Sequence, residues 1–189
     1  MDLINTTYSR RNLLKVGSAL TVGALFVPKL VFAKNVAVIK KYEKRLKLFN
    51  PNTGDHFNEV IWAEGKFIPD ALKSFDHIMR DRFTGQKIEI NRKLLEFLHT
   101  LYDRYESKQP LNVFCGYRSH KTNEQYRARK GGVAKNSKHL TGAAVDFNVP
   151  DVRLSDLRKS AIDLKAGGVG FYPKSGFIHM DIRDKLATW

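Results

Sequence analysis

The chain has 189 residues, a formal net charge of +14, six histidines and a single cysteine. One cysteine cannot form an intramolecular disulfide, so an apolar core or a bound metal has to stabilise the fold. The positive charge favours polyanionic partners. No arginine-rich run with interleaved aromatic residues is present, which argues against a nucleic-acid-binding protein.

The first 33 residues have the three parts of a secretory signal. The pair Arg10-Arg11 precedes an uncharged apolar run, Val16 to Val27, and Val31-Phe32-Ala33 offers small residues for a signal peptidase. That run spans 12 residues, whereas a transmembrane helix needs about 20. Adjacent arginines indicate the twin-arginine route. We therefore expect a periplasmic protein that meets the membrane only through its export signal; an uncleaved anchor is the alternative.

Removal of residues 1–33 would leave 156 residues with a net charge of +11, which suits one domain. Residues 34–44 are predicted to be a mobile basic lead-in, and residues 45–189 are predicted to fold. We expect a monomer. Export gives a further reason to expect acidic wall polymers, rather than nucleic acid, as partners.

The predicted elements begin with a hairpin and two helices. Alternating residues predict a strand at 45–50 and, after a turn, a second strand within 56–68. A helix is expected from Pro69 to about Arg82. A stronger helix should follow a cap at Asn91, because its apolar residues recur at helical spacing.

The second half is predicted to contain shorter elements. They are a strand at 111–115, a polar helix at 119–129, a loop at 130–138, a strand at 143–149, a helix from a Ser155 cap to about 165, and a hairpin of 169–172 with 177–182. This order predicts an α+β domain. We expect a small antiparallel sheet with helices on one side and a metal site on its open face.

Strand alternation predicts the site. Val145 and Phe147 suit the core, so Asp146 should face the other way. His179 and Asp181 should likewise share one face of the last strand. His139 lies just before the first of these strands, in a loop that could fold over the same face. Two imidazoles and a carboxylate form a common catalytic zinc shell, which leaves a fourth position for water.

The spacing of this group supports the interpretation. Gly142 allows a sharp turn into the strand, and Ala144 lies on the same face as Asp146, where a large side chain would crowd the metal. The simpler interpretation is that these are surface polar residues of an amphipathic strand. It accounts less well for residue type, spacing and strand face together.

The segment Ser137–Asp146 matches the S-x-H-x-x-G-x-A-x-D motif and resembles the zinc D-alanyl-D-alanine peptidases, which are grouped with lysostaphin-type peptidases and the hedgehog signalling domain. The chain resembles the YcbK/MepK-like murein endopeptidases more closely still. That resemblance covers the twin-arginine signal, the segments 115–119, 131–135, 166–173 and 177–181, and Trp189.

The resemblance implies that His139, Asp146 and His179 are zinc ligands. It also implies that Arg118 contacts the substrate, where a guanidinium could bind a carboxylate or stabilise the reacting oxygen. A surface charge in a turn is the alternative for Arg118. Ser137 could bind substrate or cap its loop.

One departure concerns the general base. The dipeptidases of this group carry a glutamate three residues before the last zinc histidine, and here that position is Gly176. Asp181 is the candidate replacement. It could take a proton from water, or it could orient a ligand histidine. Cys115 carries no cysteine-nucleophile signature and is interpreted as a core residue.

The predicted function is hydrolysis of the peptide cross-links of peptidoglycan by a zinc peptidase. Two alternatives stay open. One is a zinc-binding peptidoglycan-recognition module without turnover, which the missing glutamate favours; the other is a D,D- or L,D-carboxypeptidase. The sequence does not distinguish 3-3 from 4-3 cross-links as substrate.

Overall fold

The computed structural model describes residues 42–130, 133–165 and 167–189. The predicted signal (1–33) and most of the predicted lead-in (34–44) lie outside this part of the chain. The first strand begins at Glu43, so the end of the lead-in belongs to the sheet. The described residues fall within one compact unit, 39–189. None of the described helices is long and apolar enough to cross a membrane.

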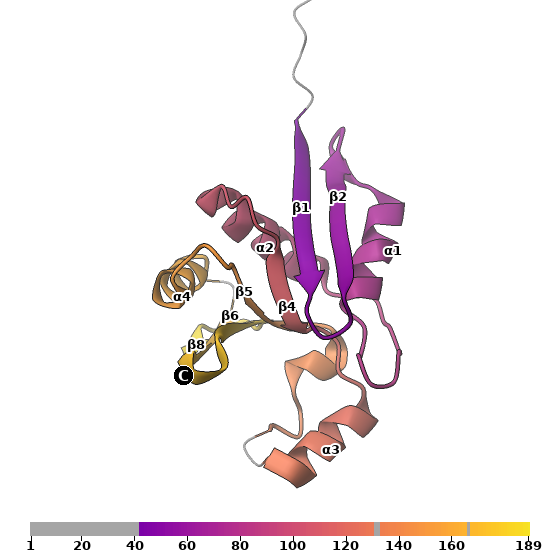
Figure 1. The fold of residues 1–189 in the computed structure, drawn as a ribbon, viewed down its shortest axis with the longest axis vertical. Coiled ribbons are helices and arrows are strands. Elements are labelled where there is room, and N and C mark those ends of the chain that lie inside the picture. The colour runs from indigo at the N-terminus through magenta and orange to yellow at the C-terminus, as the bar shows by residue number, and fades with distance from the viewer. Residues whose placement is uncertain (1–41, 131–132, 166) are drawn as a thin grey trace, which may run out of the picture. The chain divides into compact units, whose positions relative to one another are not determined.

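Within the described residues, eight strands form one sheet in the order β3-β2-β1-β4-β5-β7-β6-β8 (Figure 1). Only the pairs β1/β4 and β6/β8 are parallel. The predicted α+β class with a mainly antiparallel sheet is therefore confirmed. The strands are β1 (Glu43–Asn50), β2 (Asp55–Ala63), β3 (Lys66–Phe67), β4 (Leu111–Cys115), β5 (Ala144–Asn148), β6 (Gly167–Tyr172), β7 (Phe177–Ile182) and β8 (Ala187–Thr188).

In the same part of the chain, four α-helices and two short 3-10 helices connect these strands. They are α1 (Pro69–Ile78), α2 (Arg92–Tyr105), α3 (His120–Lys130), α4 (Leu154–Asp163), η1 (Lys138–Thr141) and η2 (Pro173–Ser175). The helix α3 lies apart from α1, α2 and α4 (Figure 1). It is strongly polar, so it has little apolar surface to bury.

Two predicted helix boundaries are wrong. The first helix ends at Ile78 rather than near Arg82, because the Asp81 side chain accepts hydrogen bonds from the amides of Phe83 and Thr84 and so forms a turn. Ser155 does not cap α4. Arg153 occupies that position, and Ser155 lies inside the first turn.

Both predicted hairpins are confirmed, as β1 with β2 and β6 with β7. The side chains of β5 and β7 alternate between the two faces of the sheet. Val145 and Phe147 of β5 and Ile178 and Met180 of β7 are fully buried in one core cluster with apolar residues of α1, α2 and α4. These helices therefore cover the face to which the four side chains point. The alternate residues of β5 and β7 point to the opposite face, which carries the candidate site.

Candidate active site

The first two residues of the site are brought together by strand register. Asp146 of β5 lies directly opposite His179 of β7 in an antiparallel pair. Side chains opposite each other in such a pair share a face and lie close together. The pairing that the alternation predicted is therefore present.

The third residue, His139, is positioned by η1. The Ser137 side chain caps this helix by accepting a hydrogen bond from the His139 amide. Gly142 ends it in the left-handed conformation, at φ +63°, and so provides the sharp turn that the sequence predicted. The turn leads into β5 and leaves the His139 side chain buried over the sheet.

The three side chains converge through one atom each. His139 Nε2 lies 3.2 Å from His179 Nδ1 and 3.3 Å from Asp146 Oδ1, and His179 Nδ1 lies 2.8 Å from the same oxygen. Ligands bound tetrahedrally at zinc–nitrogen distances of about 2.0–2.1 Å are separated by about 3.3 Å. The donor types and their spacing therefore fit a small divalent cation.

The other nitrogen of each imidazole has its own acceptor. His139 Nδ1 donates to the carbonyl oxygen of Gly116 at 2.7 Å. His179 Nε2 donates to Asp181 Oδ2 at 3.0 Å. These bonds place the ring protons away from the centre, so that His139 Nε2 and His179 Nδ1 present lone pairs to it.

The buried carboxylate of Asp146 makes the centre attractive to positive charge. Burial lowers the pKa of both imidazoles, but neighbouring acidic groups outweigh it, and the pKa of both rings is raised. At His139 these groups are Cys115 and Asp146, and at His179 they are Asp146 and Asp181. Burial raises the pKa of Asp146, and the two histidines lower it further than burial raises it. The three groups thus favour a bound cation, whether protons or a metal ion.

Asp181 is enclosed by donors. It is only 1% exposed, and besides His179 it accepts hydrogen bonds from the Gly168 amide at 3.1 Å and from the Arg183 guanidinium. His179 and Arg183 hold the pKa of Asp181 below its usual range in spite of its burial. Of the two roles that the sequence left open for Asp181, these contacts favour orienting the histidine.

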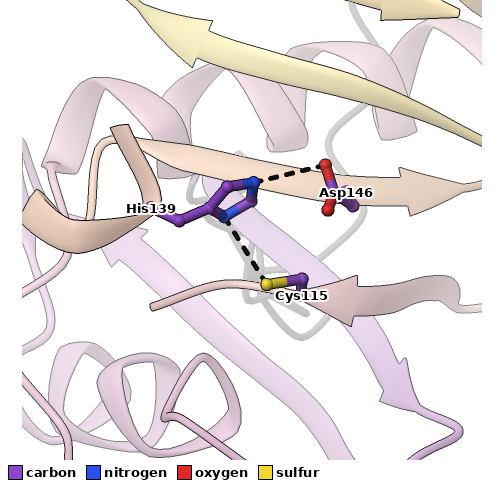
Figure 2. A group of neighbouring side chains, drawn as sticks. All are labelled: Cys115, His139 and Asp146. Atoms are coloured by element: carbon purple, nitrogen blue, oxygen red, sulfur yellow. Dashed lines mark hydrogen bonds and ion pairs between the residues drawn. The ribbon is translucent and has the colours of Figure 1, made fainter. Parts of the chain in front are cut away.

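Cys115 provides a second possible donor beside His139. Figure 2 shows the His139 ring between Asp146 at one nitrogen and Cys115 at the other. The Cys115 sulfur lies 3.6 Å from Nδ1, and one ligand atom from each of these three residues lies within 4.8 Å of the others. Such a group could hold a metal. However, the two ring nitrogens point in diverging directions, and Nε2 faces His179, so the trio with His179 is the more compact donor set.

The expectation that Cys115 is a core residue is wrong. Alternation from Leu111 and Val113 predicted it, but the pairing of β4 with β5 shifts register between Val113 and Cys115. The shift places Cys115 opposite Asp146 and at the wall of the cleft. A local irregularity of this kind redirects a side chain, and the residue pattern does not reveal it.

The centre opens into a cleft of about 870 Å³. Arg118 lies in its wall and is 9% exposed. Its guanidinium donates to Asn123 Oδ1 at 3.3 Å and to the Cys115 sulfur at 3.5 Å. Its Nε is buried without a hydrogen-bond partner, and across residues 42–130, 133–165 and 167–189 no carboxylate forms an ion pair with it.

An aromatic wall lies on the His179 side of the cleft. The Trp189 ring is 5.4 Å from the His179 ring, and its indole N–H donates to the Tyr172 hydroxyl at 2.8 Å. Gly170, opposite His179 in register, leaves room for the indole, since a Cβ there would lie 2.7 Å from the Trp189 Nε1. Trp189 is therefore packed closely beside a candidate ligand.

Comparisons with known proteins show the family of the chain. Residues 39–189 match the family described as peptidoglycan L,D-endopeptidase MepK. The chain belongs to the MepK family. It is 35% identical over 173 residues to the peptidoglycan L,D-endopeptidase MepK of Escherichia coli K12, covering 92% of this chain and 93% of that protein. It is 35% identical over 184 residues to the probable peptidoglycan L,D-endopeptidase MepK of Haemophilus influenzae, covering 96% and 95%. The resemblance to MepK-like endopeptidases is confirmed.

Several residues of this candidate site were not predicted from the sequence. Arg183 could have been predicted from the strand pattern, because it continues the face of His179 and Asp181 beyond the end of β7. The carbonyl oxygen of Gly116 could not have been predicted, because every residue has a backbone acceptor whatever its side chain. Arg82, Asn52 and Tyr126 also line the cleft, although they come from a turn, a hairpin and α3 that are distant in the chain.

Proposed function

We propose that the chain is a zinc-dependent murein endopeptidase that hydrolyses peptide cross-links of peptidoglycan. The observation that carries the proposal is the convergence of His139 Nε2, Asp146 Oδ1 and His179 Nδ1 within 3.3 Å. Two imidazole lone pairs and a carboxylate oxygen repel one another at this spacing unless a cation lies between them. Their number and type are those of a catalytic zinc site.

In this proposal His139, Asp146 and His179 hold the zinc ion. When bound, zinc supplies a Lewis acid that polarises a carbonyl and lowers the pKa of a water molecule to about 7. The reaction adds water to the amide carbon and breaks the C–N bond, and the nitrogen leaves as an amine with one proton from the water.

Arg118 is proposed to steady negative charge on the substrate. Its charge is buried without a carboxylate partner in the described part of the chain, and its Nε donor is unsatisfied. A carboxylate or a developing oxyanion in the cleft would satisfy both requirements. Ser137 already accepts the His139 amide, and its hydroxyl proton remains available at the cleft for substrate.

Asp181 is proposed to be a positioning residue. With donors from His179, Gly168 and Arg183 around it, the carboxylate fixes the ring and tautomer of His179. The general base stays unassigned on this proposal. Besides Asp146, Asp181 is the only side-chain carboxylate among the described residues that line the cleft.

The names of the related proteins support a proposal for the substrate. Their names specify an L,D-endopeptidase of peptidoglycan, and we propose the same class of bond for this chain. In an L,D bond the carbonyl belongs to an L centre and the nitrogen to a D centre. Of the two cross-links that the sequence left open, this favours the 3-3 type. It also favours an endopeptidase over a carboxypeptidase.

The test is incubation of the purified protein with isolated sacculi. We expect cross-linked muropeptides to be cut, the products to disappear with a chelator, and activity to return with zinc. The competing proposal is a recognition module without turnover, which the enclosed Asp181 and the absence of a glutamate at Gly176 favour. Zinc-dependent binding to sacculi without soluble products would establish that alternative.

Export is part of the proposal. Arg10 and Arg11, the apolar run and the small residues before position 34 support secretion by the twin-arginine route to the periplasm. Replacement of both arginines with lysine should retain the protein in the cytoplasm, as checked by cell fractionation. Normal export of that variant would refute the assigned route.

A further inference from the structure

Arg82 is a second arginine of the cleft wall whose charge has no carboxylate partner among the described residues. Its guanidinium donates to Asn52 Oδ1 and, at 2.9 Å, to the Tyr126 hydroxyl. It also lies over the Phe83 ring, 4.6 Å from its centroid. All of these partners are neutral. They fix the direction of the guanidinium and leave its positive charge available.

Arg82 and Arg118 are held by the same tyrosine. The Arg118 guanidinium lies over the Tyr126 ring, 5.0 Å from its centroid, while Arg82 bonds the hydroxyl of that ring. Arg118 also contacts Cys115, which neighbours the ligand His139. Successive contacts therefore lead from the metal centre to Arg118 and then, through Tyr126, to Arg82.

The turn that carries Arg82 is tied to the loop that carries Arg118. The buried carboxylate of Asp81 accepts the Ser119 amide at 2.7 Å and the Phe83 amide at 2.8 Å. The Tyr117 amide donates to the Met79 carbonyl at 2.7 Å. Gly116 permits this contact, because a Cβ there would lie 2.6 Å from the same carbonyl oxygen. The two arginines thus sit on segments that are fixed to each other.

We propose that Arg82 forms a second anion subsite, which binds a substrate carboxylate farther from the scissile amide than the one at Arg118. This inference rests on the proposed function, and the feature of the substrate that Arg82 selects is the distal carboxylate. Cross-linked stem peptides carry several free carboxylates. A peptide with two of them, one near the scissile amide and one farther along, matches two arginines on one wall. A peptide whose distal carboxylate is amidated should bind less well.

The experiment measures kcat and KM of the zinc-loaded protein on a cross-linked muropeptide dimer and on the same dimer with its distal carboxyl amidated. The variants are Arg82→Gln, Arg82→Lys and the control Arg45→Gln. Arg45 is an exposed arginine that also donates only to neutral groups, the carbonyl and side-chain oxygens of Asn58, but it lies outside the cleft.

We expect R82Q to raise KM for the free-acid dimer roughly tenfold with little change in kcat. R82K should raise it less, and R45Q should leave it unchanged. Amidation should raise the KM of the wild type to the level of R82Q and should not affect R82Q further. Equal KM values for R82Q and R45Q, or equal sensitivity of wild type and R82Q to amidation, would overturn the subsite.

Failure of the Arg82 subsite can be distinguished from failure of the endopeptidase proposal. If the wild-type protein with zinc releases no product, the endopeptidase proposal fails. The subsite is then decided by titration calorimetry of the two dimers with the same four proteins. A Kd that rises for R82Q with the free-acid dimer, and not with the amidated one, supports it; equal Kd values refute it.

Discussion

The two sides of the cleft differ in how their charged groups are paired. Around the proposed metal centre the second nitrogen of each histidine has an acceptor, and Asp181 is surrounded by donors. On the arginine wall, Arg118 and Arg82 have no carboxylate partner among the described residues. A closed network with a negative carboxylate at its centre is suited to hold a cation. Unpaired guanidiniums are suited to receive an anion.

Removal of a proposed ligand should have the largest effect. We expect His179→Ala to lose bound zinc and to reduce turnover to background, because two donors do not complete a catalytic shell. Zinc content by mass spectrometry and product release from sacculi measure this. His120→Ala, which changes an exposed histidine of α3 outside the cleft, should alter neither quantity. Full zinc occupancy in His179→Ala would remove His179 from the donor set.

Loss of charge on the arginine wall should spare the metal. Arg118→Gln is expected to lower kcat/KM by about 10²–10³, the range seen when a group that stabilises a reacting oxyanion is removed. Zinc content should stay unchanged, since the Arg118 side chain donates to Asn123 and Cys115 and to none of the three proposed ligands, and its backbone bond to His139 is retained in the variant. A variant that loses zinc in parallel with activity would show that the two sides of the cleft are not independent.

Asp181→Asn separates positioning from proton transfer. If Asp181 orients His179, zinc affinity should fall about 10–100-fold, and excess zinc should restore much of the turnover. Competition with a chelating dye gives the affinity, and activity is followed as zinc is added. A variant that binds zinc normally yet stays inactive would instead identify Asp181 as the general base.

The smallest expected effect concerns Asp81, which joins the segments of Arg82 and Arg118. Burial raises its pKa, but hydrogen bonds from Thr122, Ser119 and Phe83 outweigh it and lower the pKa from 3.8 to about 2. The stabilisation from the ionised Asp81 is complete above the pKa that this group has in the unfolded chain. It is lost as the pH falls through the lower pKa of Asp81 in the folded protein. We expect the free energy of unfolding to drop by about 2 kcal/mol between pH ~4 and pH ~2 from this group.

Urea denaturation at a series of pH values tests this prediction. The control is Asp81→Asn, in which this part of the pH dependence should be absent and the protein less stable at pH 7. An identical pH dependence of wild type and variant would show that Asp81 does not carry it.

Alternation predicted much of the fold and of the metal side of the site. Asp146 and His179 alternate with apolar residues, so each had to face away from the core once β5 and β7 were assigned. Element boundaries were less accurate. Asp81 ended α1 early through its side chain, and the irregularity before Cys115 turned that residue into the cleft. Side-chain hydrogen bonds and register shifts of this kind depend on neighbours that periodicity does not describe.

Residue order alone determined the α+β class, the faces of the last strands and the three candidate ligands, because strand periodicity and the spacing from His139 to Asp146 are local properties. The tertiary structure decided which nitrogen of each histidine faces the centre, how Asp181 is engaged and which arginines lack a counter-ion. These properties depend on groups far apart in the chain, such as the Gly116 carbonyl beside His139 and Tyr126 between Arg82 and Arg118. Their positions follow only when the sheet, the turn after α1 and α3 have been brought together.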